Sequence, residues 1–438
     1  MRSKEAMMKW KLWMLLLLTG IGVILTSCSE DDGYQPSPTP IVPHTKPVQE
    51  LIRICDESTE VRQLLQHSIS QAAAVNPDRN YNPAQTLDEF FNFIDRNVRC
   101  LPWDVMIHPS PTAYGKSLYG RTDQGIGYFW FVVDQPLDEL KDRGYFYPTV
   151  EYVEPFASWL TTYCQSWGDW LSTEESWNDS YYEMVKNDSD WGMPQGWYGN
   201  SNRWKTFNEF FSRSLISPDQ RPIADATVIC PTDATIKAPN NDAVPLETWK
   251  IDDQNQLEYS DVQVKTCRIR DVAQLIGKES AYSEAFAGGS LTHMFLDVNN
   301  YHRYHAPVDG ELVELRRIPG IAAGGGYTLW DNEEKLYYYV NDLGFQMIET
   351  RACAIFKTQD YGLVAMLPVG MSQICSVNWL PTLKVGQQLK RGDEMGFFQF
   401  GGSDIILLFQ KDVQVEMLAK GKKVTLMGEA LAQLIKKQ

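Results

Sequence analysis

The sequence predicts an α+β protein with a helical N-terminal domain followed by a β-rich C-terminal domain. In the first part, apolar residues recur at helical spacing, for example at Leu51, Ile54, Val61, Leu64 and Leu65. From about residue 205, short apolar runs of strand length alternate with glycine-containing turns. At 438 residues the chain is long enough for two or three domains with a large core.

The composition is that of an acidic globular protein. Apolar residues make up 43% of the chain and aromatic residues 12%, while the formal net charge is -16. A nucleic-acid partner normally requires a basic face, so we expect none.

Residues 1–27 are predicted to be a signal peptide of the lipoprotein type. A basic start precedes the uncharged run Leu12–Leu25, whose 14 residues are too few for a good membrane span. The segment Leu25-Thr26-Ser27-Cys28 resembles a bacterial lipobox, in which Cys28 becomes the first mature residue and carries lipid. We therefore expect a lipid-anchored protein of the cell envelope, outside the cytoplasm, with the outer membrane favoured. The alternative is a single anchor helix followed by a chance cysteine.

Residues 28–47 are predicted to be an acidic and proline-rich tether. Five prolines between residues 36 and 47 favour an extended spacer. The acidic stretch Ser29–Asp32 resembles export signals of surface lipoproteins in some Gram-negative bacteria, and a solvated linker explains it equally well.

Residues 48–204 form the predicted helical domain. Thr86 and Glu89 are spaced as a capping box ahead of an apolar stretch. Seven of the 14 tryptophans lie between residues 159 and 204. Tryptophans in such numbers favour a core and domain interface, and the alternative is an aromatic wall of a substrate pocket.

Residues 205–438 form the predicted β-rich domain. It opens with a short amphipathic helix within 206–213, which Pro218 and Pro222 end. Strand-like runs follow at 226–229, 293–298, 311–315, 336–340, 352–356, 363–367 and 405–409. Glycines predict the turns between them, including turns at Gly310 and Gly370.

The cysteines do not predict a metal site. Seven follow Cys28, and no two of them form a CxxC pair. One or two disulfides would be compatible with a place outside the cytoplasm, but their pairing cannot be read from the sequence. We expect no metal.

Four residues are candidates for chemistry. His302 and His305 lie together in YHRYHAPVDG, and histidine is the natural proton-transfer group near neutral pH. Other interpretations are an ordinary surface pair, or a metal site with His293 as third ligand. Asp233 follows an apolar run, and Ser403 closes a Gly-Gly-Ser corner whose glycines permit unusual backbone conformations. Asp233, His305 and Ser403 could form a triad, which is recognised by roles and not by order.

Five blocks in order resemble the phosphatidylserine decarboxylase family. They are FNEFFSR from Phe207, the block around Asp233, YHRYHAPVDG from Tyr301, the stretch 349–356 with the following Gly370 block, and the segment 400–409. The resemblance covers roughly 205–425. The N-terminal region and the Gly-Gly-Ser corner are similar to the fungal L-tryptophan decarboxylase branch, which has an extra N-terminal domain.

The resemblance implies a pyruvoyl cofactor that a zymogen makes from its own serine. Ser403 attacks the carbonyl of Gly402, and His305, oriented by Asp233, takes the serine proton. Elimination and hydrolysis then leave a pyruvoyl group and a 36-residue fragment, 403–438. A substrate amine forms a Schiff base with this group and loses CO2, after which His302 returns a proton to the substrate carbon.

Three departures from the family pattern stand near these residues. Asp404 replaces the usual Thr after the serine, Ala234 replaces a frequent Gly, and the segment from Glu349 to Arg351 replaces Asn-Glu-Arg. Asp404 brings a negative charge next to the amide of the future pyruvoyl group, so it is expected to slow cleavage or to shape amine recognition.

The resemblance leaves the substrate open. Conversion of phosphatidylserine to phosphatidylethanolamine, in phospholipid biosynthesis, fits a protein held at a membrane by lipid on Cys28. Decarboxylation of a free L-amino acid such as tryptophan fits the tryptophan-rich domain and the acidic mature chain. A lipoprotein that only binds nutrients on a non-catalytic scaffold is the alternative from another class.

Overall fold

A computed structural model describes residues 43–198, 204–236, 249–257, 271–341, 348–371, 376–419 and 424–437. The predicted signal peptide, Cys28 and the tether as far as residue 42 lie outside these residues. The chain divides into two units, 1–45 and 46–438, and the described helices and strands lie in the second. Both the helical and the β-rich regions belong to that unit.

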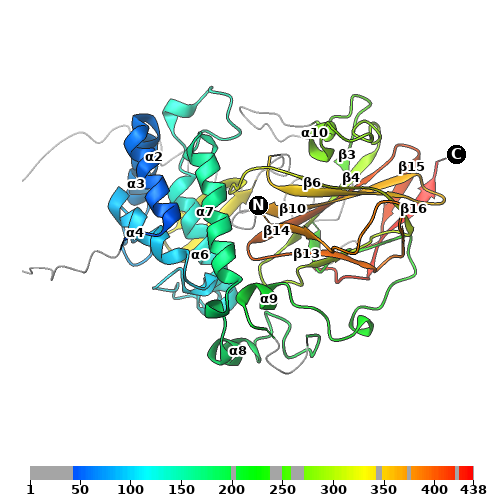
Figure 1. The fold of residues 1–438 in the computed structure, drawn as a ribbon, viewed down its shortest axis with the longest axis horizontal. Helices are drawn as coiled ribbons and strands as arrows, with labels where there is room; N and C mark the ends of the chain where they lie inside the picture. Colours follow the sequence, from blue (N-terminus) through cyan, green and yellow to red (C-terminus); the bar gives the residue numbers. More distant parts are fainter. Residues whose placement is uncertain are drawn as a thin grey trace, which may run out of the picture. The chain divides into compact units, whose positions relative to one another are not determined.

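The N-terminal part of this unit is helical (Figure 1). Its α-helices are α2 (Lys46–Glu57), α3 (Thr59–Val75), α4 (Leu87–Asn97), α5 (Ala113–Lys116), α6 (Leu118–Val133), α7 (Phe156–Leu171) and α8 (Asp179–Val185). Short 3-10 turns lie at Pro102–Asp104, Asp138–Leu140, Val150–Tyr152 and Glu174–Ser176. Thr86 caps α4 by accepting a hydrogen bond from the Glu89 N–H, as the spacing predicts.

The core of the helical region is mainly aromatic. Trp103, Trp130 and Trp191 are among the largest fully buried side chains. The same apolar cluster includes Tyr301 and Phe400 from the β-rich region, so the two regions share a continuous core. Burial of this many aromatic rings supplies a large part of the hydrophobic stabilisation. The tryptophans therefore serve as core and interface, as their number predicts.

The β-rich part begins after α9 (Phe207–Phe211) and a 3-10 turn at Pro218–Gln220. Its strands are β1 (Val228–Ile229), β2 (Thr235–Ile236), β3 (Trp249–Lys250), β4 (Ser290–Leu296), β5 (Arg303–His305), β6 (Gly310–Ile318), β7 (Gly326–Asp331), β8 (Leu336–Asn341), β9 (Arg351–Lys357), β10 (Leu363–Met371), β11 (Val377–Trp379), β12 (Gln388–Leu389), β13 (Glu394–Phe398), β14 (Gly402–Phe409), β15 (Val413–Met417) and β16 (Ala430–Lys436), with α10 (Val272–Ile276) before β4. The α+β prediction is confirmed.

The strands pair antiparallel throughout the described ladders. The main sheet has the order β12-β6-β9-β10-β14-β4-β2, with β3 beside β4. Smaller sheets are β1-β16-β15 and β11-β13-β5, and β7 with β8 forms a hairpin. This hairpin contacts α6 and joins the helical region to the β-rich region.

Two of the predicted turns are wrong, because their glycines lie in strands. Gly310 begins β6, and Gly370 lies in β10 directly opposite Ser403 of β14. Strand β10 is paired on both sides, by β9 and β14, so its ladder continues through the glycine. The absence of a side chain at Gly370 leaves room next to Ser403 on the neighbouring strand β14, and the glycine does not indicate a turn.

Both faces of β14 are covered. Ile405, Leu407 and Phe409 belong to one core cluster, and Ile406 and Leu408 belong to another. Because successive side chains of a strand point to opposite faces, Ser403 shares the face of Ile405, and the next residue takes the other face. The sheet therefore separates the Ser403 side chain from the Asp404 side chain.

Within the described residues, three further observations bear on the predictions. Cys55, Cys100, Cys164, Cys230 and Cys353 carry thiols and not disulfides. No cluster of three or more His, Cys, Asp or Glu there could hold a metal ion. No helix among them is long and apolar enough to cross a membrane.

Candidate active site

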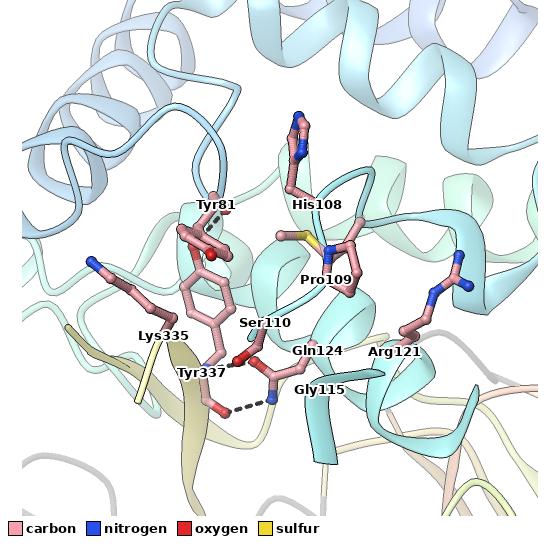
Figure 2. Close-up of a pocket in the computed structure, with 10 residues that line it drawn as sticks. Tyr81, His108, Pro109, Ser110, Gly115, Arg121, Gln124, Lys335 and Tyr337 are labelled. Atoms are coloured by element: carbon pink, nitrogen blue, oxygen red, sulfur yellow. Dashed lines mark hydrogen bonds between the residues drawn. The ribbon is translucent and has the colours of Figure 1, made fainter. Parts of the chain in front are cut away.

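A small pocket in the helical region is not the site that the sequence predicts. Its volume is about 10 Å³, and its lining includes Tyr81, His108, Arg121, Lys335 and Tyr337 (Figure 2). A volume of that order holds about one water molecule. None of the predicted catalytic residues lines it.

The predicted scissile bond lies at the start of β14, behind an unusual backbone conformation. Gly401 has a φ of 137°, which side-chain-bearing residues rarely adopt, so this corner requires glycine. Ser403 is fully buried, and its Oγ has no hydrogen-bond partner among the described residues. Ser403 pairs with Gly370 on one side and with Leu296 on the other. Directly opposite Cβ atoms stand about 5 Å apart, so glycine at 370 leaves room beside the serine.

His302 is a buried imidazole with one open nitrogen. Its Nδ1 lies 2.9 Å from the carbonyl oxygen of Asn300. A carbonyl only accepts, so Nδ1 carries the proton, and Nε2 has no partner among the described residues. The ring stacks on Phe211 with centroids 3.9 Å apart. Burial first, and then the charge of Arg213, lower the pKa of His302 well below its usual range. His302 is therefore a neutral base.

His305 has partners at both ring nitrogens. Nδ1 donates to the carbonyl oxygen of Gly392 at 2.8 Å, and Nε2 accepts from the Tyr301 hydroxyl at 3.0 Å. Burial lowers the pKa of His305, so this ring is also neutral. The Nε2 lone pair is already in use, and it reaches the serine only if the Tyr301 hydroxyl moves or relays the proton.

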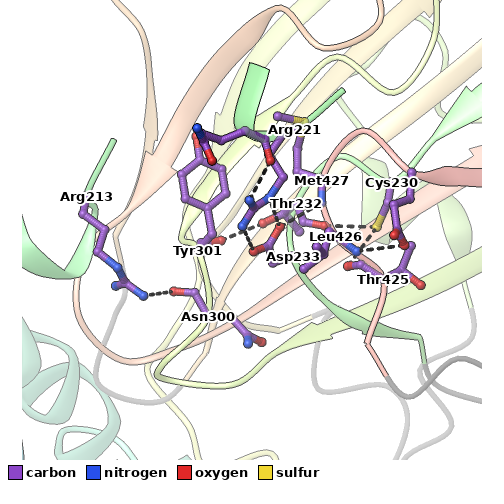
Figure 3. Close-up of polar contacts among 12 residues, drawn as sticks. Arg213, Arg221, Cys230, Thr232, Asp233, Asn300, Tyr301, Thr425, Leu426 and Met427 are labelled. Atoms are coloured by element: carbon purple, nitrogen blue, oxygen red, sulfur yellow. Dashed lines mark hydrogen bonds and ion pairs between the residues drawn. The ribbon is translucent and has the colours of Figure 1, made fainter. Parts of the chain in front are cut away.

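Asp233 does not make the direct contact with His305 that the sequence predicts. Its two oxygens accept from Nε and a terminal nitrogen of Arg221 at 3.1 and 2.7 Å (Figure 3). The backbone N–H of Met427 donates to the same carboxylate at 2.8 Å. The planar guanidinium matches the carboxylate fork and takes the place expected for the imidazole. Both side chains of the ion pair are buried.

Tyr301 connects the Asp233 ion pair to His305. The Arg221 guanidinium lies over the Tyr301 ring, 6.0 Å from its centroid. The hydroxyl of Thr232, next to Asp233, donates to the Tyr301 carbonyl at 2.9 Å. The hydrogen-bonded connection from Asp233 toward His305 therefore runs through this intermediate layer, and the charge of Asp233 adds a weaker effect that raises the pKa of His305.

Asp404, which follows the serine, pairs with a histidine outside the predicted site. Its carboxylate contacts Nε2 of His293 on β4, and both side chains are buried. The strand pleat places this pair on the sheet face opposite to Ser403. His293 thus lies in an ion pair and not in a cluster with His302 and His305.

Comparison with known proteins identifies the family. The family model for phosphatidylserine decarboxylase matches residues 207–433, just over half of the chain. The chain belongs to the phosphatidylserine decarboxylase family. The match contains Asp233, both predicted catalytic histidines and Ser403, and it begins at α9. The family predicted from the sequence blocks is confirmed.

Three relatives illustrate the range of the family. Phosphatidylserine decarboxylase proenzyme 2 of Oryza sativa subsp. japonica is 32% identical over 216 residues, which are 48% of this chain and 30% of the rice protein. Phosphatidylserine decarboxylase proenzyme of Ruminiclostridium cellulolyticum is 28% identical over 250 residues, 54% of this chain and 72% of that protein. L-tryptophan decarboxylase of Psilocybe cyanescens is 28% identical over 227 residues, 50% and 49% of the two chains. The matched region thus spans about half of the fungal protein and less than a third of the rice protein.

Asn208, the second residue of the family match, has a role that sequence reasoning missed. Asn208 on α9 accepts a hydrogen bond from the Phe400 N–H at 3.0 Å. Its amide donates to the Gly168 carbonyl and the Ser172 hydroxyl of the helical region, both at 2.9 Å. Phe400 lies two residues before the scissile Gly402 and packs against Trp167 of α7. The helical region therefore helps to place the cleavage corner.

Two arginines also escaped prediction, namely Arg213 and Arg221. Arg213 ends the FNEFFSR block, which suggests only an amphipathic helix when its apolar spacing is read. Arg221 lies in the turn between Pro218 and Pro222, and no local sequence pattern marks it. Arg221 pairs with Asp233, 12 residues further along, and the shortest hydrogen bond of Arg213 goes to Asn299, so neither partner follows a helix or strand spacing that sequence reading could use.

Proposed function

We propose that this chain is a pyruvoyl-dependent decarboxylase that cleaves itself between Gly402 and Ser403. The observation that carries the proposal is the buried Oγ of Ser403, which has no hydrogen-bond partner among the described residues and lies two residues after the left-handed corner at Gly401. A buried hydroxyl without a partner is costly, and it is kept where chemistry requires it. Membership of the phosphatidylserine decarboxylase family supports the same reaction class.

Self-cleavage uses groups of the chain itself. The Ser403 Oγ attacks the Gly402 carbonyl carbon and forms an ester, while the peptide nitrogen of Ser403 takes a proton and leaves that carbon. Elimination then removes the Cα proton of residue 403, breaks its Cβ–Oγ bond and releases the chain that ends at Gly402 as a carboxylate. Water hydrolyses the remaining dehydroalanine to the keto group and releases its nitrogen as ammonia. His305 is the predicted proton acceptor, and Asp233 supports it through Arg221 and Tyr301. The glycine corner lets Oγ approach the preceding carbonyl.

The surroundings of Ser403 fit a pyruvoyl group. Gly370 places no side chain opposite the residue, and the Ser403 Oγ has no hydrogen-bond partner among the described residues. A pyruvoyl group supplies a ketone that captures the substrate amine and accepts electrons when CO2 leaves. His302 is the predicted residue for returning a proton to the substrate, and its open Nε2 supports that role.

Mass spectrometry of the purified chain tests the proposal. Cleavage gives a fragment that covers residues 403–438, without the serine side-chain hydroxyl and amine. Ser403→Ala should give only the uncleaved chain. An intact wild-type chain that is folded would refute the proposal and favour the non-catalytic binding protein. A Ser403→Ala chain that still splits at this bond would refute the role of Ser403.

Phosphatidylserine is the first candidate substrate, with phosphatidylethanolamine as product. The rice and Ruminiclostridium relatives carry the name phosphatidylserine decarboxylase proenzyme. A free L-amino acid such as tryptophan is the second, because relatives from two Psilocybe species carry the name L-tryptophan decarboxylase. CO2 release should be compared on phosphatidylserine vesicles and on a panel of amino acids. Turnover of free tryptophan alone would exclude the phospholipid role.

We also propose that lipid on Cys28 holds the protein at a membrane of the cell envelope, with the outer membrane favoured. The lipobox-like segment that ends at Cys28 supports this proposal. Cells fed an alkyne fatty acid should label the wild-type chain and not a Cys28→Ala variant. Equal labelling of both chains would contradict the assignment.

A further inference from the structure

Arg213, just after α9, is a buried cation that lacks a carboxylate partner among the described residues. It is 1% exposed. One terminal nitrogen donates to the carbonyl oxygens of Trp191, Asn299 and Asn300 at 3.1, 2.7 and 3.2 Å, and the other donates weakly toward those of Phe210 and Phe211 at 3.5 and 3.4 Å. Its Nε has no partner in the same described part.

The buried surroundings of Arg213 are energetically unfavourable for a charged group. Burial lowers the pKa of its guanidinium, and the Tyr198 hydroxyl and the more remote carboxylate of Asp233 only partly oppose this shift. The rings of Tyr198, Phe210 and Trp191 lie 4.5, 5.3 and 5.7 Å from it. A well-packed apolar residue would usually stabilise such a position at least as well. Packing alone therefore does not account for a cation here.

The guanidinium shares its acceptor with the candidate base of the active site. The Asn300 carbonyl receives Arg213 from one side (Figure 3) and Nδ1 of His302 from another. This carbonyl fixes the proton of His302 on Nδ1, because it can only accept. The Phe211 ring, two residues before Arg213, stacks on the imidazole and holds its plane. The Asn300 carbonyl thus connects the Arg213 guanidinium to the imidazole of His302.

We propose that Arg213 is a positioning residue that acts through His302, keeping the ring uncharged with Nδ1 protonated and Nε2 open. It holds the Asn300 carbonyl in place and repels a second proton on the imidazole. Both effects leave the Nε2 lone pair available to a substrate.

The role rests on the proposed decarboxylase function. A substrate arrives as an ammonium ion and must lose a proton before its amine can attack a ketone. His302 Nε2 accepts that proton. After the bond to CO2 has broken, the substrate carbon forms its new C–H bond with that electron pair and takes the same proton back from Nε2. The nearby cation makes the transient imidazolium a stronger acid, which favours the return.

NMR of the uncleaved full chain tests the proposal without the cofactor. The Ser403→Ala chain is labelled with 15N in its six histidines, and His302 is assigned by comparison with a His302→Gln variant. We expect Nδ1 protonated, Nε2 unprotonated, and no protonation of the ring at neutral pH. Arg213→Gln should shift the His302 titration to higher pH. Arg213→Lys, which keeps the charge, should shift it less.

A distant charge gives the matched control. Arg143→Gln removes a cation that pairs with Glu60 in the helical region, and it should leave the His302 titration in place. An unmoved titration in a natively folded Arg213→Gln chain would overturn the proposal. If that variant does not fold, the tautomer in the Ser403→Ala chain decides, and a proton on Nε2 overturns it. None of these results depends on whether the wild-type chain cleaves itself, which the fragment assay measures separately.

The cleaved enzyme provides a second readout. In wild type, His302 stays neutral into mildly acidic solution, so its proton-accepting step should be insensitive to pH there. In Arg213→Gln the ring becomes charged at higher pH, so kcat/KM should fall on the acidic side while the value near neutral pH changes less. A raised His302 titration together with an unmoved acidic limb of the rate profile would overturn the shuttle.

Discussion

Replacement of Asn208 by alanine tests whether the helical region takes part in self-cleavage. The Asn208 side chain is buried and joins Gly168 of α7 and Ser172, directly after α7, to the backbone of Phe400. Alanine removes all three hydrogen bonds and leaves the Phe400 N–H without its partner. The corner at residues 401–403, where cleavage is proposed, begins directly after Phe400. We therefore expect an effect on cleavage beyond the loss of stability.

The hydrogen bonds set the size of the expected effect. Loss of the three bonds, with a buried N–H left unpaired, should lower the free energy of unfolding by about 2–4 kcal/mol. A displacement of the corner by about 1 Å is enough to slow a reaction that depends on position by about 100-fold. Asn208→Ala should therefore slow release of fragment 403–438 by roughly 10- to 100-fold.

The assay follows the fragment over time in chains made by cell-free synthesis, with unfolding by urea measured in the Ser403→Ala background. Asn82→Ala is the matched control. Asn82 is equally buried and also has three hydrogen bonds, to Ala72, Asn76 and Tyr128, all within the helical region. It should lower stability by a similar amount and cleave at the wild-type rate while folded. Equal cleavage rates for both variants, at equal folded fraction, would refute the positioning role.

Three further outcomes are expected. Gly401→Ala should slow cleavage, because alanine at a φ of 137° costs about 1–3 kcal/mol, whereas Gly386→Ala, at a positive φ of 89° on an exposed turn, should leave the rate unchanged. Asp233→Asn in the Ser403→Ala background should lower the urea-measured unfolding free energy by about 3–5 kcal/mol, because it leaves buried Arg221 without its carboxylate. Burial raises the pKa of Glu151 from 4.5 to about 7, so the folded state holds a proton that the unfolded chain has lost. Stability should therefore fall by about 3 kcal/mol as pH rises from 4.5 to 7 and then level off, and Glu151→Gln should flatten that part of the urea-measured curve.

The sequence predicted the fold class because each region follows one dominant periodicity. Helical spacing before residue 205 and strand-length runs after it depend on local patterns, which survive in the folded chain. The turn predictions at Gly310 and Gly370 were wrong because each of these glycines lies in a strand, where the missing side chain leaves room for a neighbouring segment. Gly370 matters because it faces Ser403 across the ladder, and that pairing is set by the register of two strands distant in sequence.

The sequence predicted which residues make up the candidate site, but it did not predict which contacts they make. The motif blocks named Asp233, His302, His305 and Ser403. Which carboxylate meets which cation is decided by long-range packing, and Arg221 rather than His305 receives Asp233. A histidine motif also does not reveal that one ring has both nitrogens engaged while the other keeps Nε2 open. Those differences arise from single carbonyl and hydroxyl groups, for which sequence spacing carries no signal.

The pleat of β14 explains how the chain accommodates an aspartate directly after the scissile serine. A buried carboxylate beside Ser403 would be costly and would oppose the negative charge that develops on its Oγ. Alternation instead sends the Asp404 side chain to the other face, where His293 receives it. Phe295 lies directly opposite Asp404 on β4, and His293 is its diagonal neighbour two residues away, a separation that long side chains bridge. The charge is thus compensated on one face while the serine remains in apolar surroundings on the other, so Asp404 and His293 act as one unit that is compatible with self-cleavage.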